Sequence, residues 1–264
     1  MSKIFDERLV PEESTEDNII YNEHLIRYRL AGEFVKEKIV LDIACGSGYG
    51  AKILAKKGAK EVIAIDIDEK SIKKAKENFR EEKVEYIVGD CLDTKLEDKK
   101  FDTIVSFETI EHLKNQDKYL EELKRVLKDD GLIVVSTPNR EVFGNKNPFH
   151  VHEFTKKEFE ELLKKYFQYV QIFEQRNGLA SSIQISGLEE AKVYFGEKTK
   201  PWYYIAFCSN IEIASDLLKK NYLSVNYVAL ENINNNLGFK LVNRIYSFLI
   251  KIPGIKKLFK IIKK

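Results

Sequence analysis

The alternation of apolar and polar positions predicts an α/β protein. Short apolar or β-branched runs predict seven strands, at residues 39–41, 61–65, 84–88, 101–107, 132–137, 169–174 and 202–208. Segments with helical periodicity lie among them, at residues 18–36, 49–57, 71–79, 119–128 and 156–166. Strands that alternate with helices in this way form a mostly parallel sheet with helices on both faces. A turn is predicted at residues 129–131, and irregular structure at residues 176–199.

The stretch from residue 38 to residue 68 organises the rest of the chain. A buried-strand pattern ends at Asp42 and is followed by Gly46 and Gly48, then by a helical segment and a second strand that closes on Asp66. Glycines at such a turn let the backbone approach a ligand, and an acid at the tip of the second strand can accept both hydroxyls of a ribose. The stretch therefore predicts a nucleotide-binding half-unit.

The spacing of the acid and the glycines in this stretch distinguishes between the cofactors that such a turn can bind. Asp42-x-x-x-Gly46-x-Gly48 differs from the G-x-G-x-x-G dinucleotide pattern, and an acid suits a cofactor that carries an ammonium and no pyrophosphate. The stretch resembles motif I of the class I S-adenosylmethionine-dependent methyltransferases, D-x-G-x-G-x-G, with Ala44 in place of the first glycine. The resemblance implies a Rossmann-like seven-stranded sheet with an antiparallel last strand, and S-adenosyl-L-methionine as cofactor. A glycine turn of some other α/β protein is the alternative.

The resemblance carries over a set of cofactor-binding residues. Asp90 follows the third strand, where it could accept the exocyclic amine of adenine while the backbone amide of Cys91 faces the ring; a plain turn residue is the alternative reading. The implied set is Arg27, Tyr28, Asp42, Ala44, Gly46, Gly48, Asp66, Ile67, Asp90, Cys91 and Phe107.

A polar motif precedes the first strand. Glu23-His24-x-x-Arg27-Tyr28 lies in the predicted helix at residues 18–36, where composition alone favours a solvated face with Tyr28 packed inward. The motif is similar to one in methyltransferases encoded with bacterial and archaeal surface-glycan pathways. That likeness implies a helical lid over the methionine end of the cofactor, in which Arg27 pairs with the carboxylate and Tyr28 closes over it.

A second group of candidate residues follows the fourth strand. If this segment is helical, Glu108, Glu111 and His112 share one face, at positions i, i+3 and i+4. Two carboxylates and an imidazole form a plausible half-site for a divalent metal ion, and His150 could complete it. The alternative is that Glu111 and His112 only cap and pack near the cofactor.

The order E-x-x-E-H, T-P-N and a histidine near E-F-T resembles the ubiquinone-pathway O-methyltransferases and the small-RNA 2′-O-methyltransferases, which are metal-assisted. The resemblance implies Mg²⁺ or Mn²⁺ at Glu108, Glu111, His112 and His150. A metal ion chelated by vicinal hydroxyls lowers the pKa of the nucleophile and fixes its angle of attack. Whichever of His150 and His152 is not a ligand could act as the catalytic base.

Composition limits the partners and the compartment. Residues 1–231 hold 36 basic and 42 acidic residues, a net charge of −6, which is not typical of a nucleic-acid-binding protein. Three isolated cysteines, a charged start and the lack of any run of about eighteen apolar residues predict a cytoplasmic protein.

The end of the chain has a different composition. Residues 232–264 contain no acid and carry a charge of +8, and from residue 237 the basic positions alternate with apolar ones. Such a segment favours peripheral contact with an anionic membrane at its inner face, although a packed helix with a solvated lysine end is the alternative. The predicted division is a lid at residues 1–36, a methyltransferase domain at residues 37–210 and a basic helical extension at residues 211–264. The oligomeric state stays open.

Together these patterns predict an S-adenosylmethionine-dependent O-methyltransferase that acts on a sugar hydroxyl of a glycan precursor. A small-molecule or RNA 2′-O-methyltransferase is the second enzymatic reading. A non-catalytic scaffold that keeps the fold is the reading from another class.

Overall fold

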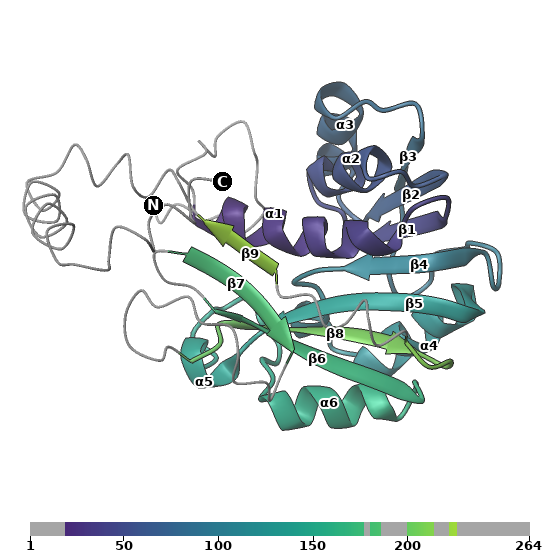
Figure 1. The fold of residues 1–264 in the computed structure, drawn as a ribbon. Helices are drawn as coiled ribbons and strands as arrows, with labels where there is room; N and C mark the ends of the chain where they lie inside the picture. Colours follow the sequence, from purple (N-terminus) through teal and green to yellow (C-terminus); the bar gives the residue numbers. More distant parts are fainter. Residues whose placement is uncertain (1–18, 177–179, 186–199, 214–221, 226–264) are drawn as a thin grey trace, which may run out of the picture. The chain divides into compact units, whose positions relative to one another are not determined.

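The computed structural model describes residues 19–176, 180–185, 200–213 and 222–225, all within the unit Met1–Val225. In these residues nine strands form one sheet, in the order β3-β2-β1-β4-β5-β8-β6-β7-β9 (Figure 1). The strands are β1 (Ile39–Ile43), β2 (Glu61–Asp66), β3 (Val84–Val88), β4 (Phe101–Ser106), β5 (Leu127–Pro138), β6 (Tyr169–Arg176), β7 (Ala180–Ile185), β8 (Tyr203–Ser209) and β9 (Tyr222–Val225).

The seven strands predicted from the sequence are confirmed. β1 pairs in parallel with β2 and β4, and β3 and β5 extend this parallel part on its two sides. β8 inserts antiparallel between β5 and β6, which confirms the expected orientation of the last of the seven strands. The carboxyl ends of β1 to β5 therefore lie at one edge of the sheet, and loops from that edge build the site.

Two predictions on this sheet are wrong in part. The segment expected to be irregular contains β7, because Ile183 and Ile185 alternate with polar residues and the strand pairs antiparallel with β6. The turn expected at residues 129–131 lies inside β5. Phe101 of β4 pairs with Leu127, but Thr103, only two residues further on, pairs with Leu132. The residues between Leu127 and Leu132 therefore form an irregularity within β5 and not a separate turn.

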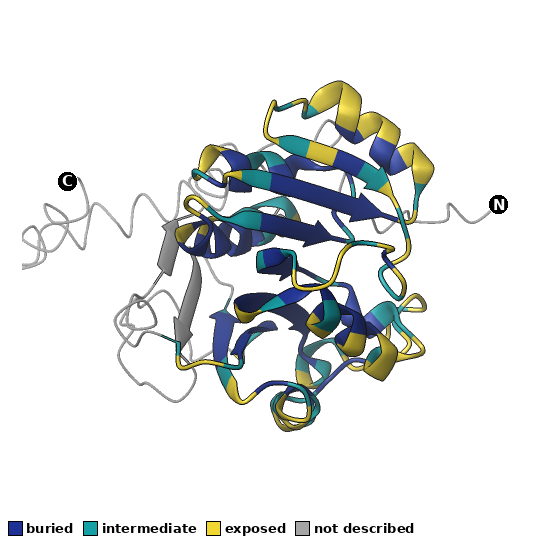
Figure 2. Ribbon diagram, turned by 90° about the vertical axis from the view of Figure 1, so that its right-hand side faces the viewer, coloured by how far each residue is buried: buried dark blue, intermediate teal, exposed yellow. Residues whose placement is uncertain are grey.

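Helices cover both faces of the sheet (Figure 1). They are α1 (Ile19–Ala31), α2 (Tyr49–Lys56), α3 (Glu69–Asn78), α4 (Gln116–Val126), α5 (Arg140–Phe143) and α6 (Lys156–Lys164), with short 3₁₀ helices at Gly32–Phe34 (η1) and Ile110–His112 (η2). Side chains alternate along each strand, so Val40 packs with α1 to α3 while its neighbour Leu41 packs with α4 and α6. Figure 2 shows the result: the strands are largely buried and the outer helix faces are exposed.

Local capping explains where the helices begin. Asp68 accepts the Ser71 amide at 3.0 Å and caps α3. Thr155 and Glu158 form a capping box that starts α6. Asn115 caps α4, so this helix begins three residues earlier than its apolar pattern indicates.

Part of the sequence-based scheme falls outside the described residues. The lid is described from Ile19 onward, and of the C-terminal extension only residues 211–213 and 222–225 are described. The basic amphipathic segment at residues 237–264 therefore lies outside the described part of the chain. Within that part, no helix has the length and apolarity needed to cross a bilayer.

Candidate functional site

A cavity of about 1030 Å³ lies at the carboxyl ends of the parallel strands. Its floor comes from the turn after β1, the end of β2 and the loops after β3, β4 and β5, and helix α1 and the loop after α5 add further walls. This is where open α/β sheets bind their ligands. The volume is at the upper end of the usual range for small-molecule sites, roughly 300–1,000 Å³, so it has room for more than one ligand.

The turn after β1 brings bare backbone to the cavity. Gly46 has φ 56° and lines the cavity, and a Cβ placed there would meet no atom within 4 Å. Ala44 also has φ 58°, a left-handed conformation that a non-glycine residue adopts at a cost of roughly 1–2 kcal/mol. The structure thus places Ala44, which stands where the motif has its first glycine, in a left-handed conformation.

Asp66 faces the cavity in a fixed orientation. Its Oδ2 accepts the Gly46 amide and its Oδ1 accepts the Asp68 amide, each at 2.9 Å. A carboxylate held in this way at the edge of a ligand cavity is a suitable acceptor for the hydroxyls of a ribose. Residue Ile67 lines the same part of the cavity and is 67% exposed, an apolar surface that a planar ring could cover.

The loop after β3 supplies Gly89, Asp90, Cys91 and Leu92 to the cavity. Asp90 accepts the Leu92 amide through Oδ1 at 2.9 Å, which closes the start of this loop. Burial, with the neighbouring Asp90 charge, raises the pKa of the Cys91 thiol to about 12, so the thiol stays protonated. The predicted adenine side, Asp90 with Cys91, therefore lies on the cavity wall.

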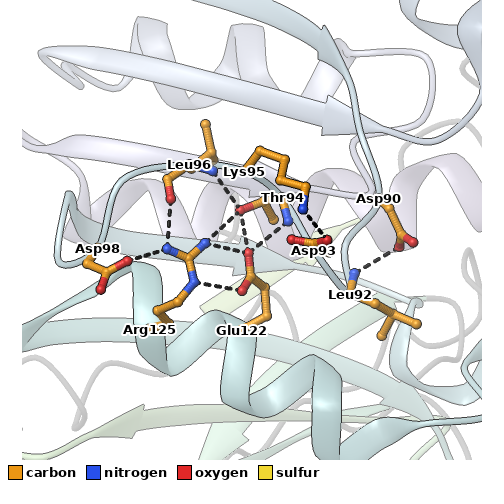
Figure 3. A network of polar contacts seen from close by, with 9 residues as sticks. All are labelled: Asp90, Leu92, Asp93, Thr94, Lys95, Leu96, Asp98, Glu122 and Arg125. Carbon is orange, nitrogen blue, oxygen red and sulfur yellow. Dashed lines mark hydrogen bonds and ion pairs between the residues drawn. The ribbon is translucent and has the colours of Figure 1, made fainter.

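A partly buried ion pair anchors this loop to α4 (Figure 3). Arg125 donates to both carboxylate oxygens of Glu122, at 2.8 and 2.7 Å, and to the Leu96 carbonyl. Glu122 Oε1 also accepts the hydroxyl and the amide of Thr94. The hydrogen bonds from Arg125 lower the pKa of Glu122 to about 2.

We expect Glu122→Gln to destabilise the fold by about 2 kcal/mol at pH 7, because the variant loses the charge-assisted pair while Arg125 stays in place. The native pKa of Glu122 lies below its usual value. Its contribution is therefore complete above the usual pKa and disappears as the pH falls toward 2. Urea unfolding from pH 7 to pH 3 measures the difference. Glu121→Gln, at an exposed neighbour on α4, is the control and should leave the stability unchanged.

Helix α1 contributes Tyr28, whose hydroxyl donates to Asp42 Oδ1 at 3.1 Å. Gly50 makes this approach possible, because a Cβ there would lie 2.0 Å from the Tyr28 ring. Burial raises the pKa of Asp42 to about 7, and its Oδ2 is buried without a partner among the described residues. A buried carboxylate with a free oxygen fits a nearby cationic group.

Arg27 lies next to this wall and is fully buried. Its Nη1 donates to Gln175 Oε1 at 2.8 Å, and the guanidinium packs over the Tyr203 ring, 4.5 Å from the centroid. Nε and Nη2 have no partner in the described part of the chain. Such unpaired donors fit an anion, although Tyr203 and not Arg27 lines the cavity.

Three candidate metal ligands meet at another wall. Potential donor atoms of Glu111, His112 and His150 all lie within 4.8 Å of one another. Glu111 is fully buried, its Oε1 lacks a partner among the described residues, and burial together with the Glu108 charge raises its pKa. His112 must donate its Nδ1–H to the Phe149 carbonyl at 3.0 Å, which leaves the Nε2 lone pair free, 4.0 Å from Glu111 Oε1.

His150 is oriented by a second carboxylate. Its Nδ1 contacts Glu153 Oε1 at 2.8 Å, the arrangement by which proteins usually orient a metal-binding histidine. Its Nε2 lies 3.0 Å from the Asn147 amide nitrogen, so a metal ion would replace that hydrogen bond. The Val151 amide donates to the Glu111 carbonyl at 2.8 Å and holds the loop against η2. These donors and the unpartnered carboxylate oxygen fit a divalent cation.

Two of the predicted residues lie apart from this cluster. Glu108 lines the cavity, but its Oε1 accepts the Ser136 hydroxyl at 2.6 Å. The helix expected to start at Glu108 does not form, because Glu108 has φ 51° and η2 begins only at Ile110. His152 packs its ring on Phe154 and does not line the cavity.

The cavity also contains residues that the sequence did not single out as site residues. His24 lies inside a motif noted in the sequence, whereas Tyr203 and Asn147 carry no local signal. The orienting partner Glu153 was likewise missed, although it directly follows His152 and a carboxylate near a histidine is a recognisable pairing.

Comparisons with known proteins agree with this fold. A family model described as a methyltransferase domain matches residues 41–135. A Mycobacterium tuberculosis protein named "Probable S-adenosylmethionine-dependent methyltransferase" is 35% identical over 162 residues, which are 60% of this chain and 58% of that protein. A ubiquinone biosynthesis O-methyltransferase of Pelagibacter ubique is 30% identical over 125 residues, covering 47% of this chain and 50% of the relative. The match with this chain thus spans between half and three fifths of the length of these relatives.

The fold is also found among solved structures. A Pyrococcus horikoshii protein superposes with a TM-score of 0.55 at 25% identity, covering 76% of this chain and 96% of that protein. The glycine turn after β1 and the acid at the end of β2 lie within the region matched by the family model. The chain therefore has the Rossmann-like fold of a methyltransferase, and its residues 41–135 match a methyltransferase domain.

Proposed function

We propose that this protein is an O-methyltransferase that uses S-adenosylmethionine and a divalent cation to methylate a sugar hydroxyl. The observation that carries the proposal is the cluster of Glu111, His112 and His150, with a buried, unpartnered carboxylate oxygen, beside the cavity that Asp66 and Gly46 line. Cofactor site and candidate metal site thus border one space.

The residues present suit the cofactor. Asp66 would accept the ribose hydroxyls, the loop of Asp90 and Cys91 would face the adenine, and the bare backbone at Gly46 leaves room between them. Asp42 and Arg27 each keep an unpartnered buried polar group, of opposite charge, which suits the ammonium and the carboxylate of a methionine moiety. When bound, S-adenosylmethionine supplies an electrophilic methyl group.

The candidate metal ligands favour an oxygen nucleophile. A divalent cation held by Glu111, His112 and His150 would lower the pKa of a coordinated hydroxyl. Carboxylate oxygen with imidazole suits Mn²⁺, and Mg²⁺ to a lesser degree. Vicinal hydroxyls chelate such an ion, whereas amines and thiols do not offer that geometry.

Several features support a sugar of a glycan precursor as the acceptor. The cavity wall combines the aromatic rings of Phe143, Phe149 and Tyr203 with the polar side chains of Lys146 and Asn147, a mixture that suits the apolar faces and hydroxyls of a sugar ring. The +8 charge of residues 232–264 supports an acceptor displayed at an anionic surface. The motif on α1 agrees with surface-glycan methyltransferases.

A phenolic acceptor is the second candidate. Phe149 and Val151 are about half exposed, and Phe149 lines the cavity, so its wall has an apolar edge. Two similar proteins are named as a tocopherol O-methyltransferase and a ubiquinone biosynthesis O-methyltransferase. An RNA 2′-hydroxyl is less favoured because the body of the chain is acidic.

The proposal is tested by methyl transfer from labelled cofactor to a panel of nucleotide-activated sugars, a catechol and a short RNA. We expect transfer to a sugar, abolished by EDTA and restored by Mn²⁺ or Mg²⁺, because the acceptor hydroxyl is activated by the cation. Calorimetry with S-adenosylhomocysteine is the control, and chelator should change that affinity less than twofold. Full activity in EDTA would contradict a metal-assisted reaction and would mean that Glu111 and His112 only pack near the cofactor. Methyl transfer to the catechol alone would favour the phenolic acceptor.

A further inference from the structure

The four histidines of the chain differ in the residues that they contact. His112 and His150 belong to the candidate metal cluster, where each has one ring nitrogen held by a neighbouring oxygen. His152 packs against Phe154 away from the cavity. His24 is the remaining histidine, and neither the cofactor residues nor the metal cluster uses it.

His24 faces the cavity from helix α1. Ile20, His24 and Tyr28 are spaced four residues apart, so they form one stripe along the helix, and all three line the cavity. Tyr28, at one end of the stripe, reaches Asp42, and Ile20, at the other end, is 52% exposed. His24 therefore lies between the cofactor wall and the outer edge of the cavity.

The imidazole of His24 is uncommitted within the described part of the chain. Its ring lies 6.5 Å from the Tyr49 ring, and neither ring nitrogen makes a hydrogen bond to a described residue. A half-buried imidazole without a partner, on the wall of a ligand cavity, can accept a hydrogen bond from whatever enters.

The charged and titratable neighbours keep this imidazole neutral. Burial, and then the positive charge of Arg27 one turn along α1, hold the pKa of His24 well below its usual value. On the facing helix α2 the neighbour is the Tyr49 phenol, whose own pKa is raised by burial, so it adds no charge at neutral pH. His24 therefore offers a lone pair at pH 7.

We propose that His24 is the general base that takes the proton from the acceptor hydroxyl, an inference that rests on the proposed O-methyl transfer. The acceptor oxygen forms a bond to the methyl carbon while the carbon–sulfur bond of the cofactor breaks and sulfur keeps the electron pair. The hydroxyl proton passes to a ring nitrogen of His24 and then to solvent. His24 lies on the same helix as Tyr28, so α1 contributes both the base and part of the cofactor wall to one cavity.

The first test needs no acceptor. The ¹H NMR signals of the four imidazoles are followed from pH 5 to pH 8 in the complex with S-adenosylhomocysteine, and the His24 signal is identified by its absence in His24→Gln. We expect its titration midpoint to lie below the usual value of a histidine. A midpoint above pH 7 would overturn the proposal, because most of the His24 imidazole would then be protonated at pH 7 and could not accept a proton.

The second test measures turnover with the best acceptor of the panel. His24→Gln should lower kcat at pH 7 at least 100-fold, the usual range for a general base, and should remove the acid limb of the pH profile. The melting temperature of His24→Gln should equal that of the wild type within experimental error. Its affinity for S-adenosylhomocysteine should stay within twofold of the wild-type value. Arg29→Gln, at an exposed position of α1 that does not line the cavity, is the matched control and should keep full activity.

A third variant separates a base from a residue that only shapes the cavity. His24→Ala should regain part of its activity when imidazole is added, because the small side chain leaves space for the free base. If His24→Gln keeps kcat within threefold of the wild type, with an unchanged acid limb, His24 is not the base even though the methyltransferase assignment stands. If the wild type methylates no acceptor, the proposed function fails and the NMR midpoint alone decides the state of His24.

Discussion

Replacing Asp66 by alanine is expected to weaken the binding of S-adenosylhomocysteine about 100-fold, or about 2.7 kcal/mol. On the proposed assignment the side chain accepts two ribose hydroxyls, and in the structure it accepts hydrogen bonds from the amides of Gly46 and Asp68. The variant therefore loses two ligand hydrogen bonds and loosens the glycine turn that bounds the cofactor space. Isothermal titration calorimetry at 25 °C measures the loss directly.

The matched control for this prediction is Glu61→Ala. Glu61 is at the other end of the same strand β2, roughly 16 Å away at about 3.3 Å per residue, and it does not line the cavity. It should leave the affinity unchanged. Unaltered binding by a folded Asp66→Ala protein would contradict the assignment of β2 to the ribose.

Replacing Glu111 by glutamine is expected to have two effects of opposite sign. Affinity for Mn²⁺ should fall at least 100-fold, because the variant removes the negatively charged ligand of the cluster. The metal-free protein should become more stable at neutral pH, because burial and the Glu108 charge make ionised Glu111 unfavourable in the fold.

The pH dependence of that second effect has a definite sign. The folded pKa of Glu111 is raised, so its own contribution to the stability of the metal-free wild type is complete below the usual pKa of a glutamate and is lost as the pH rises through the folded value. Glu111→Gln should be insensitive to this loss. Thermal unfolding from pH 4 to pH 8, with and without Mn²⁺, measures both effects. Mn²⁺ should raise the melting temperature of the wild type alone, and an equal rise in the variant would exclude Glu111 as a ligand.

The matched control for Glu111→Gln is Glu97→Gln. Glu97 lies in the loop before β4 and does not line the cavity, so Glu97→Gln should keep the metal response and the pH dependence of the wild type. A shift of similar size in this control would indicate a general charge effect rather than the loss of a ligand.

The parallel part of the fold could be predicted because the local apolar pattern of each strand agrees with its burial in the sheet. The runs around Val40, Val62 and Ile104 are buried on both faces of the sheet, so they appear as continuous apolar segments between amphipathic helices. The strand β7 was missed because its alternation of isoleucine with serine and glutamine is short and lies in a segment rich in polar residues. Its pairing with β6 is a long-range contact that no local pattern encodes.

The cofactor side of the site was predictable for a related reason. Residues that follow the ends of adjacent parallel strands necessarily meet at one edge of the sheet, and Asp66, Asp90 and Gly46 all line the same cavity. The acceptor side depends on a loop and a helix from distant parts of the sequence. Glu153 orients His150, and His24 arrives from before the first strand, so their roles depend on tertiary contacts.

The most direct test of the central claim is a crystal structure of the protein with S-adenosylhomocysteine and Mn²⁺, read by anomalous scattering at the manganese edge. The account predicts one anomalous peak bounded by Glu111, His112 and His150, and the ribose of the cofactor on Asp66. A cofactor bound elsewhere, or a manganese peak away from these three side chains, would contradict it.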